Sequence, residues 1–108
     1  MISFLLPTNR INTHPNIVNN CINSILENHL HEEIEILIFS EEEPDYKYKN
    51  IRHIKEIGRQ GPIYGFNKMV GESNGDILIC MTDDNIILEN CFNYMDLAYK
   101  AGVVGLIS

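Results

Sequence analysis

The chain has 108 residues, 44% of them apolar and 21% charged, which predicts one folded globular domain over 1–108 and excludes a disordered or membrane-embedded class. Eight Lys and Arg against 15 Asp and Glu give a formal charge of −7, which argues against a nucleic-acid surface because such a surface neutralises many phosphates. A small phosphate-bearing ligand remains compatible if a cation, Arg and Lys, or helix amides supply local positive charge.

The cysteines and the start of the chain bear on the location of the protein. The cysteines are odd in number, widely separated and set in apolar stretches, which predicts buried free thiols and a reducing, cytoplasmic setting. They are Cys21, Cys80 and Cys91. The apolar start, 2–6, stops at Pro7 and is too short for a signal peptide or a membrane span. We therefore expect a cytoplasmic protein with no transmembrane segment.

The first half of the chain predicts two strands around one helix. Residues 2–6 favour β-structure and stop at a proline, which suits a strand that ends there. Residues 15–30 begin with a proline and repeat apolar residues at helical spacing, so they predict an amphipathic helix. Residues 34–40 are almost continuously apolar, which is typical of a strand buried on both faces.

The second half predicts two helices and three strands. A polar loop leads to a short third strand at 51–57, near a sheet edge. Residues 61–73 begin with Gly-Pro and predict a helix, and 76–82 repeat the buried-strand pattern. A third helix is expected at 89–101 and a fifth strand at 103–108. The apolar residues expected on one face of the second helix are Ile63, Phe66, Met69 and Val70.

The resulting order, βαββαβαβ, is that of an α/β protein. Alternating helices and apolar strands predict a mainly parallel sheet with helices on both faces, a three-layer α/β/α arrangement. In such sheets, ligands bind beyond the carboxyl ends of the strands, near the point where the strand order reverses. The loops that follow Leu6, Ser40 and Thr82 are therefore the candidate site.

Two adjacent acids, Asp83 and Asp84, come directly after the fourth predicted strand. Neighbouring carboxylates in a partly dry crevice repel each other unless a cation is present, and Mg²⁺ is typically held by one or two carboxylates and the phosphates of a substrate. The pair thus indicates a site for a metal ion and a diphosphate. The alternative is that the acids and Asn85 form only a turn and a helix cap.

Polar side chains follow the first two strands as well. Pro7, Thr8, Asn9 and Arg10 offer a hydroxyl, an amide and a guanidinium, which could contact a base, a ribose or phosphates; a polar loop without a ligand is the alternative. After the second strand, Glu41 could reach a ribose or a base, or belong to a solvated charge run.

Several other site classes find no support in the sequence. Arg59 and Lys68 flank the start of the second helix, where free amides favour anions, although a structural role explains that start equally well. The four histidines show no zinc-ligand spacing with each other or with the cysteines. There is no nucleophile elbow, P-loop or G-x-G-x-x-G motif, which weakens the hydrolase, NTPase and dinucleotide interpretations.

In their order and spacing, these motifs resemble the amino-terminal, nucleotide-sugar-binding half of family 2 glycosyltransferases, which have the GT-A fold. In that family the first strand ends in a proline-threonine turn such as Pro7 and Thr8. A helix that carries an asparagine such as Asn67 precedes a Gly-Asp pair, and an acidic D-x-D or D-D element closes the next strand. The resemblance covers essentially the whole chain and implies a Rossmann-like nucleotide-binding half.

The resemblance also implies roles for particular residues and the identity of the ligands. Pro7, Thr8 and Arg10 would lie against the nucleotide, Asp83 would face the ribose or the metal, and Asp84 would ligate Mn²⁺ or Mg²⁺ bridging the diphosphate. The partners implied are a nucleotide-diphospho sugar and an unknown acceptor. Where the family usually has a base-contacting aspartate after the second strand, this chain has Glu41 followed by another glutamate.

The length leaves two functional hypotheses open. In the family, the acceptor-binding half and the catalytic base lie beyond the point that corresponds to Ser108, so no catalytic base can be named. The chain is then the donor-binding part of a metal-dependent glycosyltransferase, or a non-catalytic nucleotide-binding or assembly module derived from one.

Overall fold

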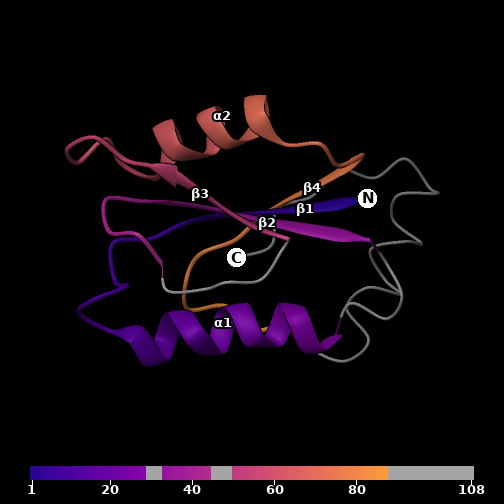
Figure 1. Ribbon diagram of the computed structural model, residues 1–108, viewed down its shortest axis with the longest axis horizontal. Coiled ribbons are helices and arrows are strands. Elements are labelled where there is room, and N and C mark those ends of the chain that lie inside the picture. The colour runs from indigo at the N-terminus through magenta and orange to yellow at the C-terminus, as the bar shows by residue number, and fades with distance from the viewer. Residues whose placement is uncertain (29–32, 45–49, 88–108) are drawn as a thin grey trace.

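In the computed structural model, the described residues (1–28, 33–44 and 50–87) form a parallel sheet with a helix on either side (Figure 1). The elements are β1 (Ile2–Pro7), α1 (Pro15–Asn28), β2 (Ile34–Ser40), β3 (Ile51–Lys55), α2 (Pro62–Glu72) and β4 (Ile77–Cys80). Their order confirms the predicted βαββαβ. The helix expected at 89–101 and the strand expected at 103–108 lie outside the described residues.

The sheet has the strand order β3-β2-β1-β4, and all of its pairings are parallel. From β1 the chain adds β2 and β3 on one side and then returns to place β4 on the other side. The strand order therefore reverses between β1 and β4. Figure 1 shows α1 on one face of this sheet and α2 on the other, which confirms the three-layer α/β/α class.

The alternation of side chains along β1 explains why both faces of the sheet are apolar. Phe4 and Leu6 belong to the core beneath α1, whereas Leu5 belongs to the core beneath α2. Successive side chains of a strand point to opposite faces, so a strand between two helices is largely apolar on both of its faces. Every residue of β2 is buried for the same reason.

Helix α2 packs on the sheet with a different face from the one expected. Met69 and Gly65 are its buried residues, whereas Ile63 is 78% exposed and Val70 46%, so the predicted face is wrong for these two. A Cβ on Gly65 would lie only 2.5 Å from a ring carbon of Phe39. The missing side chain lets the helix approach the sheet closely and centres the contact on that position.

The strands β3 and β4 form the two edges of the described sheet. The short strand β3 lies at one edge, as predicted for 51–57. The strand β4 lies at the other edge, and only Ile79 in it is buried. Ile77 and Ile79 pack into the core beneath α1, and Leu78 and Cys80 pack against the core beneath α2. The expectation of a strand covered on both faces at 76–82 is therefore confirmed, although β4 is less fully buried than β2.

A buried carboxylate at the amino ends of the strands fixes the entry into β4. Glu35 accepts hydrogen bonds from the Ser3 hydroxyl (2.8 Å) and from the Asn74 backbone N–H (2.7 Å) and side-chain amide (3.2 Å). The Gly75 N–H donates in turn to the Ser3 hydroxyl at 2.8 Å, and Arg52 lies 3.5 Å from Glu35. This cluster ties the loop before β4 to β1 and β2.

Two further expectations concern the cysteines and the membrane. Cys21 and Cys80 are free thiols, as predicted, but only Cys21 of the two is buried and Cys80 is partly buried. Cys91 lies outside the described residues. Within the described ranges, no helix has both the length and the apolar character needed to cross a membrane.

Candidate functional site

A pocket of about 530 Å³ opens at the carboxyl ends of the strands, where the strand order reverses. It brings together seven of the eight residues that the sequence singles out as candidate ligands. These are Pro7, Thr8, Asn9, Arg10, Glu41, Asp83 and Asp84. The location agrees with the general rule for ligand sites in open parallel sheets.

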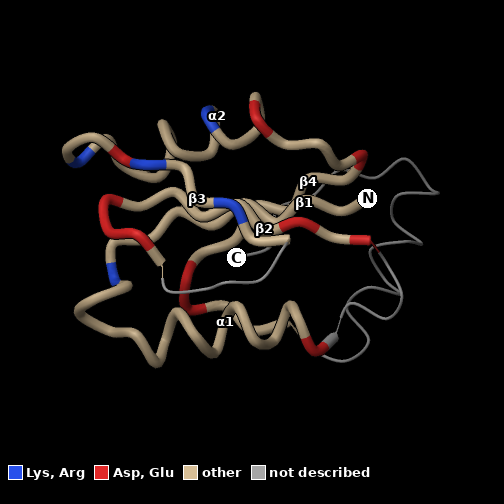
Figure 2. Tube along the Cα trace, viewed as in Figure 1, with Lys and Arg blue, Asp and Glu red and all other residues tan. Residues whose placement is uncertain are grey.

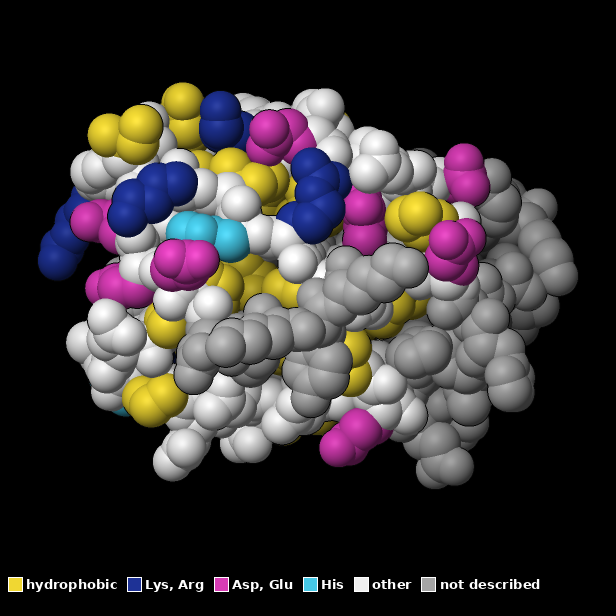
Figure 3. Space-filling view, viewed as in Figure 1, with side chains coloured by type: hydrophobic (Ala, Val, Ile, Leu, Met, Phe, Trp, Pro, Cys, Tyr) yellow, Lys and Arg dark blue, Asp and Glu magenta, His cyan; other side chains and the backbone are white. Residues whose placement is uncertain are grey.

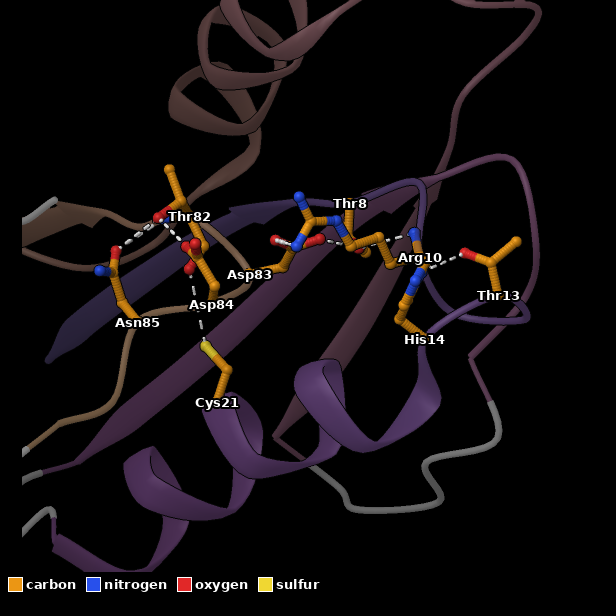
Figure 4. A network of polar contacts seen from close by, with 9 residues as sticks. All are labelled: Thr8, Arg10, Thr13, His14, Cys21, Thr82, Asp83, Asp84 and Asn85. Atoms are coloured by element: carbon orange, nitrogen blue, oxygen red, sulfur yellow. Dashed lines mark hydrogen bonds and ion pairs between the residues drawn. The ribbon is translucent and has the colours of Figure 1, made fainter.

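Thr8 joins the end of β1 to the acidic segment after β4. Its backbone N–H donates to the Phe39 carbonyl (3.0 Å), which continues the pairing with β2 and fixes the position of the residue. Its hydroxyl donates to Asp83 Oδ2 at 2.7 Å and accepts the Arg10 N–H at 3.1 Å (Figure 4). An Arg10 guanidinium nitrogen lies 3.7 Å from Asp83 Oδ1. The Asp83 carboxylate is thus held on both of its oxygens.

Asp84 lies beside this group in a tight turn that begins at Thr82. The Asn85 N–H donates to the Thr82 carbonyl (3.2 Å), and the Thr82 N–H donates to the Asn85 side-chain oxygen (3.1 Å). The Thr82 hydroxyl lies 2.8 Å from Asp84 Oδ1 and 2.7 Å from the Asn85 oxygen. Because a hydroxyl carries one proton, it donates to one of the two at a time.

The electrostatics of Asp84 favour its charged form. The hydrogen bond from the Thr82 hydroxyl lowers the pKa of the Asp84 carboxyl, and so do a backbone N–H and the positive charge of Arg10. The side chain is exposed and lines the pocket. At neutral pH it therefore offers an ionised carboxylate to a ligand.

The acids of the pocket could bind a divalent ion only together with oxygen atoms that a ligand supplies. Among residues 1–28, 33–44 and 50–87, no group of three or more His, Cys, Asp or Glu side chains is arranged to hold a metal. Asp83 is already bonded to Thr8 and Arg10, whereas Asp84 is exposed at the pocket. One or two carboxylates completed by phosphates is the usual arrangement for Mg²⁺.

The structure distinguishes Glu41 from its neighbour Glu42 as a candidate ligand. Glu41 lines the pocket and Glu42 does not. The turn that carries them is held from β3, because Lys55 Nζ donates to the Glu41 carbonyl at 2.6 Å. The Ser40 hydroxyl also donates to the Glu42 carbonyl at 2.6 Å. Glu41 is therefore the acid after β2 that can meet a ligand there.

Glu56 is a pocket residue that the sequence interpretation missed. Its buried carboxylate accepts the N–H groups of Gln60 (2.9 Å) and Gly61 (3.1 Å) and closes the loop between β3 and α2. Gly58 and Gly61 in this loop have φ of 68° and 87°, values that favour glycine. The strand ends at Lys55 and not at 57 as predicted, so Glu56 directly follows β3, and the rule about carboxyl ends would have found it with the correct boundary.

Helix α2 lines the pocket through Pro62 and Phe66, which differ from the residues expected. Arg59, in the loop before the helix, lines the pocket, whereas Lys68 does not. Asn67 is exposed on α2 and is not among the lining residues. Its role in binding a nucleotide sugar stays a prediction.

The basic residues of the described chain gather on one side of the sheet. In Figures 2 and 3, Lys and Arg lie mostly along β3, α2 and the loop between them, in the upper half of the view. Arg59 from this group and Arg10 from the loop after β1 line the pocket, together with four carboxylates. A chain of net charge −7 therefore has two guanidinium groups placed where an anionic ligand would enter.

The parallel sheet with a helix on either face and a pocket at its switch point defines an α/β protein of the doubly wound class. The sequence model described as Glycosyl transferase family 2 matches residues 8–105. The chain belongs to this family of glycosyltransferases, as its motifs suggested. Among curated protein sequences, none matches the chain.

Proposed function

We propose that the pocket binds a nucleotide-diphospho sugar and that the chain is the donor-binding part of a metal-dependent glycosyltransferase. The main support is one juxtaposition: Thr8 and Arg10, after β1, meet Asp83 and Asp84, after β4, in a single pocket. Its volume of about 530 Å³ lies within the range of small-molecule sites. Family membership supplies the reaction class, transfer of a sugar to an acceptor.

In this proposal the loop after β1 contacts the nucleotide. Pro7, Thr8 and Asn9 form one wall of the pocket, and Arg10 supplies a guanidinium suited to phosphate oxygens. Glu41 accepts hydrogen bonds from the base or the ribose, because a carboxylate is an acceptor only. Asp83, held by Thr8 and Arg10 beside this wall, faces the ribose.

Mn²⁺ or Mg²⁺ would be held by Asp84, with Asp83 as the second candidate ligand and the diphosphate completing the coordination. The exposure of Asp84 and its lowered pKa support this order, since Asp83 is engaged within the protein. A bound divalent ion offsets charge on the departing nucleoside diphosphate, a Lewis-acid contribution of several kcal/mol. Arg10 and Arg59 add positive charge at the same pocket.

Calorimetry and thermal unfolding with UDP and GDP sugars, with and without Mn²⁺, test the proposal. We expect binding that requires the metal ion and stabilises the fold by about 2.7 kcal/mol at a ligand concentration about a hundredfold above Kd. Asp84→Asn should abolish the dependence on metal. Asp76→Asn is the matched control, because Asp76 is an exposed acid whose carboxylate lies 3.3 Å from the amino group of Met1.

Two outcomes of this experiment oppose the proposal. One is the absence of binding by any nucleotide, and the other is binding that Asp84→Asn and Asp76→Asn affect equally. Hydrolysis of the donor in the absence of an acceptor then separates the two hypotheses. Hydrolysis lost in Asp84→Asn supports a transferase, while binding with no hydrolysis supports a nucleotide-binding or assembly module.

A further inference from the structure

The acidic segment 82–87 is held at both of its ends by α1. At its start, the Cys21 thiol lies 3.8 Å from the Thr82 carbonyl oxygen, within reach of a weak S–H hydrogen bond (Figure 4). At its end, the Ile87 N–H donates to the Ser24 hydroxyl at 2.9 Å. Cys21 and Ser24 are three residues apart and lie on the same face of the helix. One helix face therefore contacts both ends of the segment that carries the acids.

The Ser24 hydroxyl is fixed by a second hydrogen bond. It donates to the Cys21 carbonyl at 2.7 Å, the usual bond of a helical serine to the preceding turn. With its proton engaged there, the oxygen presents its lone pairs to the Ile87 N–H. The side chains of Ser24 and Ile87 are 6% and 2% exposed, so the N–H would lose a buried partner if the hydroxyl were removed.

The anchor at Ser24 holds the segment beyond the acids, whereas backbone pairing with β1 and the contacts of Thr8 and Arg10 hold it up to Asp83. The Met81 N–H donates to the Leu5 carbonyl at 3.0 Å, the last backbone bond to β1 before the acids. Between Met81 and Ile87, Asp83 and Asp84 line the pocket. The Ile87 side chain also enters the core beneath α1.

We propose that Ser24 is a positioning residue for ligand binding, which holds the segment 82–87 so that Asp83 and Asp84 face the pocket. The inference rests on the proposed function for its effect on nucleotide and metal. A serine with a purely structural role would stabilise the fold and leave the affinity of the folded protein unchanged. The two roles are separable by comparing Ser24 with a serine of equal burial elsewhere.

Ser3 provides that comparison. It is fully buried, its hydroxyl donates to Glu35 Oε1 at 2.8 Å, and it accepts the Gly75 N–H at 2.8 Å. Like the Ser24 hydroxyl, the Ser3 hydroxyl donates a hydrogen bond and accepts one from a distant backbone N–H. It lies at the amino ends of the strands, whereas the pocket lies at their carboxyl ends.

The test compares Ser24→Ala with Ser3→Ala in the full chain. Each variant is expected to lower the free energy of unfolding in a denaturant titration. At a temperature where all proteins are folded, Ser24→Ala should weaken the binding of UDP or GDP with Mn²⁺ by about tenfold, the equivalent of about 1.4 kcal/mol. Ser3→Ala should leave that Kd within about twofold of the unaltered chain.

Amide hydrogen exchange supplies a readout that needs no ligand. Ser24→Ala should raise the exchange rate of the Asn85 and Ile87 amides by about tenfold or more relative to the amides of β1, and Ser3→Ala should not. If the unaltered chain binds neither nucleotide, the proposed function fails and the exchange result alone decides the role of Ser24.

The inference is overturned if exchange in 82–87 is the same in Ser24→Ala and the unaltered chain, or if Ser3→Ala weakens binding as much. Should Ser24→Ala not fold, Ser24→Cys replaces it, because sulfur keeps the side chain in place but is a weak acceptor. The same direction of change in exchange is then expected, and an unchanged rate overturns the inference.

Discussion

The hydroxyl of Thr8 donates a 2.7 Å hydrogen bond to the carboxylate of Asp83, across 75 residues of sequence. Both residues are buried, with 6% and 8% of their surface exposed. The bond joins the end of β1 to the segment after β4. It fixes the distance between the two loops that supply most of the candidate ligands.

Replacing Thr8 by Val should show how much this hydrogen bond contributes to the stability of the fold. The variant keeps the size of the side chain but leaves a buried carboxylate oxygen without its donor, at a cost of about 1–3 kcal/mol. Urea denaturation measures the loss, and titration with UDP and Mn²⁺ should show weaker binding. Thr8→Ser retains the hydroxyl and serves as the control. If it loses as much as Thr8→Val, packing and not the hydrogen bond is responsible.

Glu35 should make the stability of the fold depend on pH in the acidic range. Burial alone would raise the pKa of this carboxyl, but hydrogen bonds from Asn74 and Ser3 and the charge of Arg52 lower it below the ordinary 4.5. Because the folded state favours the charged form, the stabilisation is complete above pH 4.5. It is lost as the pH falls through the lower pKa of the folded state.

The measurement is urea unfolding of the wild type and Glu35→Gln between neutral pH and about pH 3. Glu35→Gln should be less stable at neutral pH by about 1–3 kcal/mol, because the amide nitrogen that replaces Oε2 cannot accept the hydrogen bond from the Asn74 side chain and does not attract Arg52. The difference in the free energy of unfolding between the two proteins should become smaller as the pH falls. Glu33→Gln removes an exposed carboxylate nearby and controls for net charge. A gap that stays constant with pH contradicts the assignment.

Gly75 and Gly71 should respond in opposite ways to alanine. A Cβ on Gly75 would lie 2.3 Å from the Ser3 hydroxyl oxygen and 2.8 Å from the Ser3 nitrogen, so Gly75→Ala should destabilise the fold by about 1–3 kcal/mol. A Cβ on Gly71, within α2, meets nothing within 4 Å. Gly71→Ala should stabilise by about 0.5–1 kcal/mol, since alanine favours helix over glycine. Thermal unfolding of both variants measures these effects. A change of the unfolding temperature in the same direction in both variants would contradict the prediction.

The strands and helices were predictable because the apolar pattern is set by burial on both faces of a parallel sheet. In β2 every position is buried, and the apolar run 36–39 is the direct consequence. The site could be located for a related reason. The ends of parallel strands share one edge, so polar residues in the loops that follow the strands, such as Thr8, Glu41 and Asp83, gather there.

The errors concern features that depend on which elements are neighbours. The buried stripe of α2 follows from the close approach of Gly65 to Phe39, and helical spacing alone does not contain that contact. The partial exposure of Cys80 in β4 follows from the place of that strand at an edge. The pairing of Thr8 with Asp83 likewise requires β1 and β4 to be adjacent, which local pattern leaves undetermined.

The Cys21 thiol should be unreactive in the folded protein. Burial raises its pKa from 9.0 to about 12, and the charges of Asp83 and Asp84 add to the effect. At pH 8 about one thiol in 10,000 is then ionised, against about one in ten for an ordinary thiol, and the thiolate is the reactive form. Modification by iodoacetamide, followed residue by residue by mass spectrometry, should therefore be slow at Cys21 and become fast when the chain is unfolded in urea.

The same thiol reports on the charge of the acidic segment. Asp84→Asn removes one of the negative charges that raise the pKa of Cys21, so modification in the folded state should become severalfold faster. Asp76→Asn, with its carboxylate at the other end of β4, should not change the rate. Because burial is the largest cause of the shift, the thiol of Asp84→Asn should still react far more slowly than in the unfolded chain. Fast modification of the folded wild type would contradict the packing of Cys21 beneath the acids.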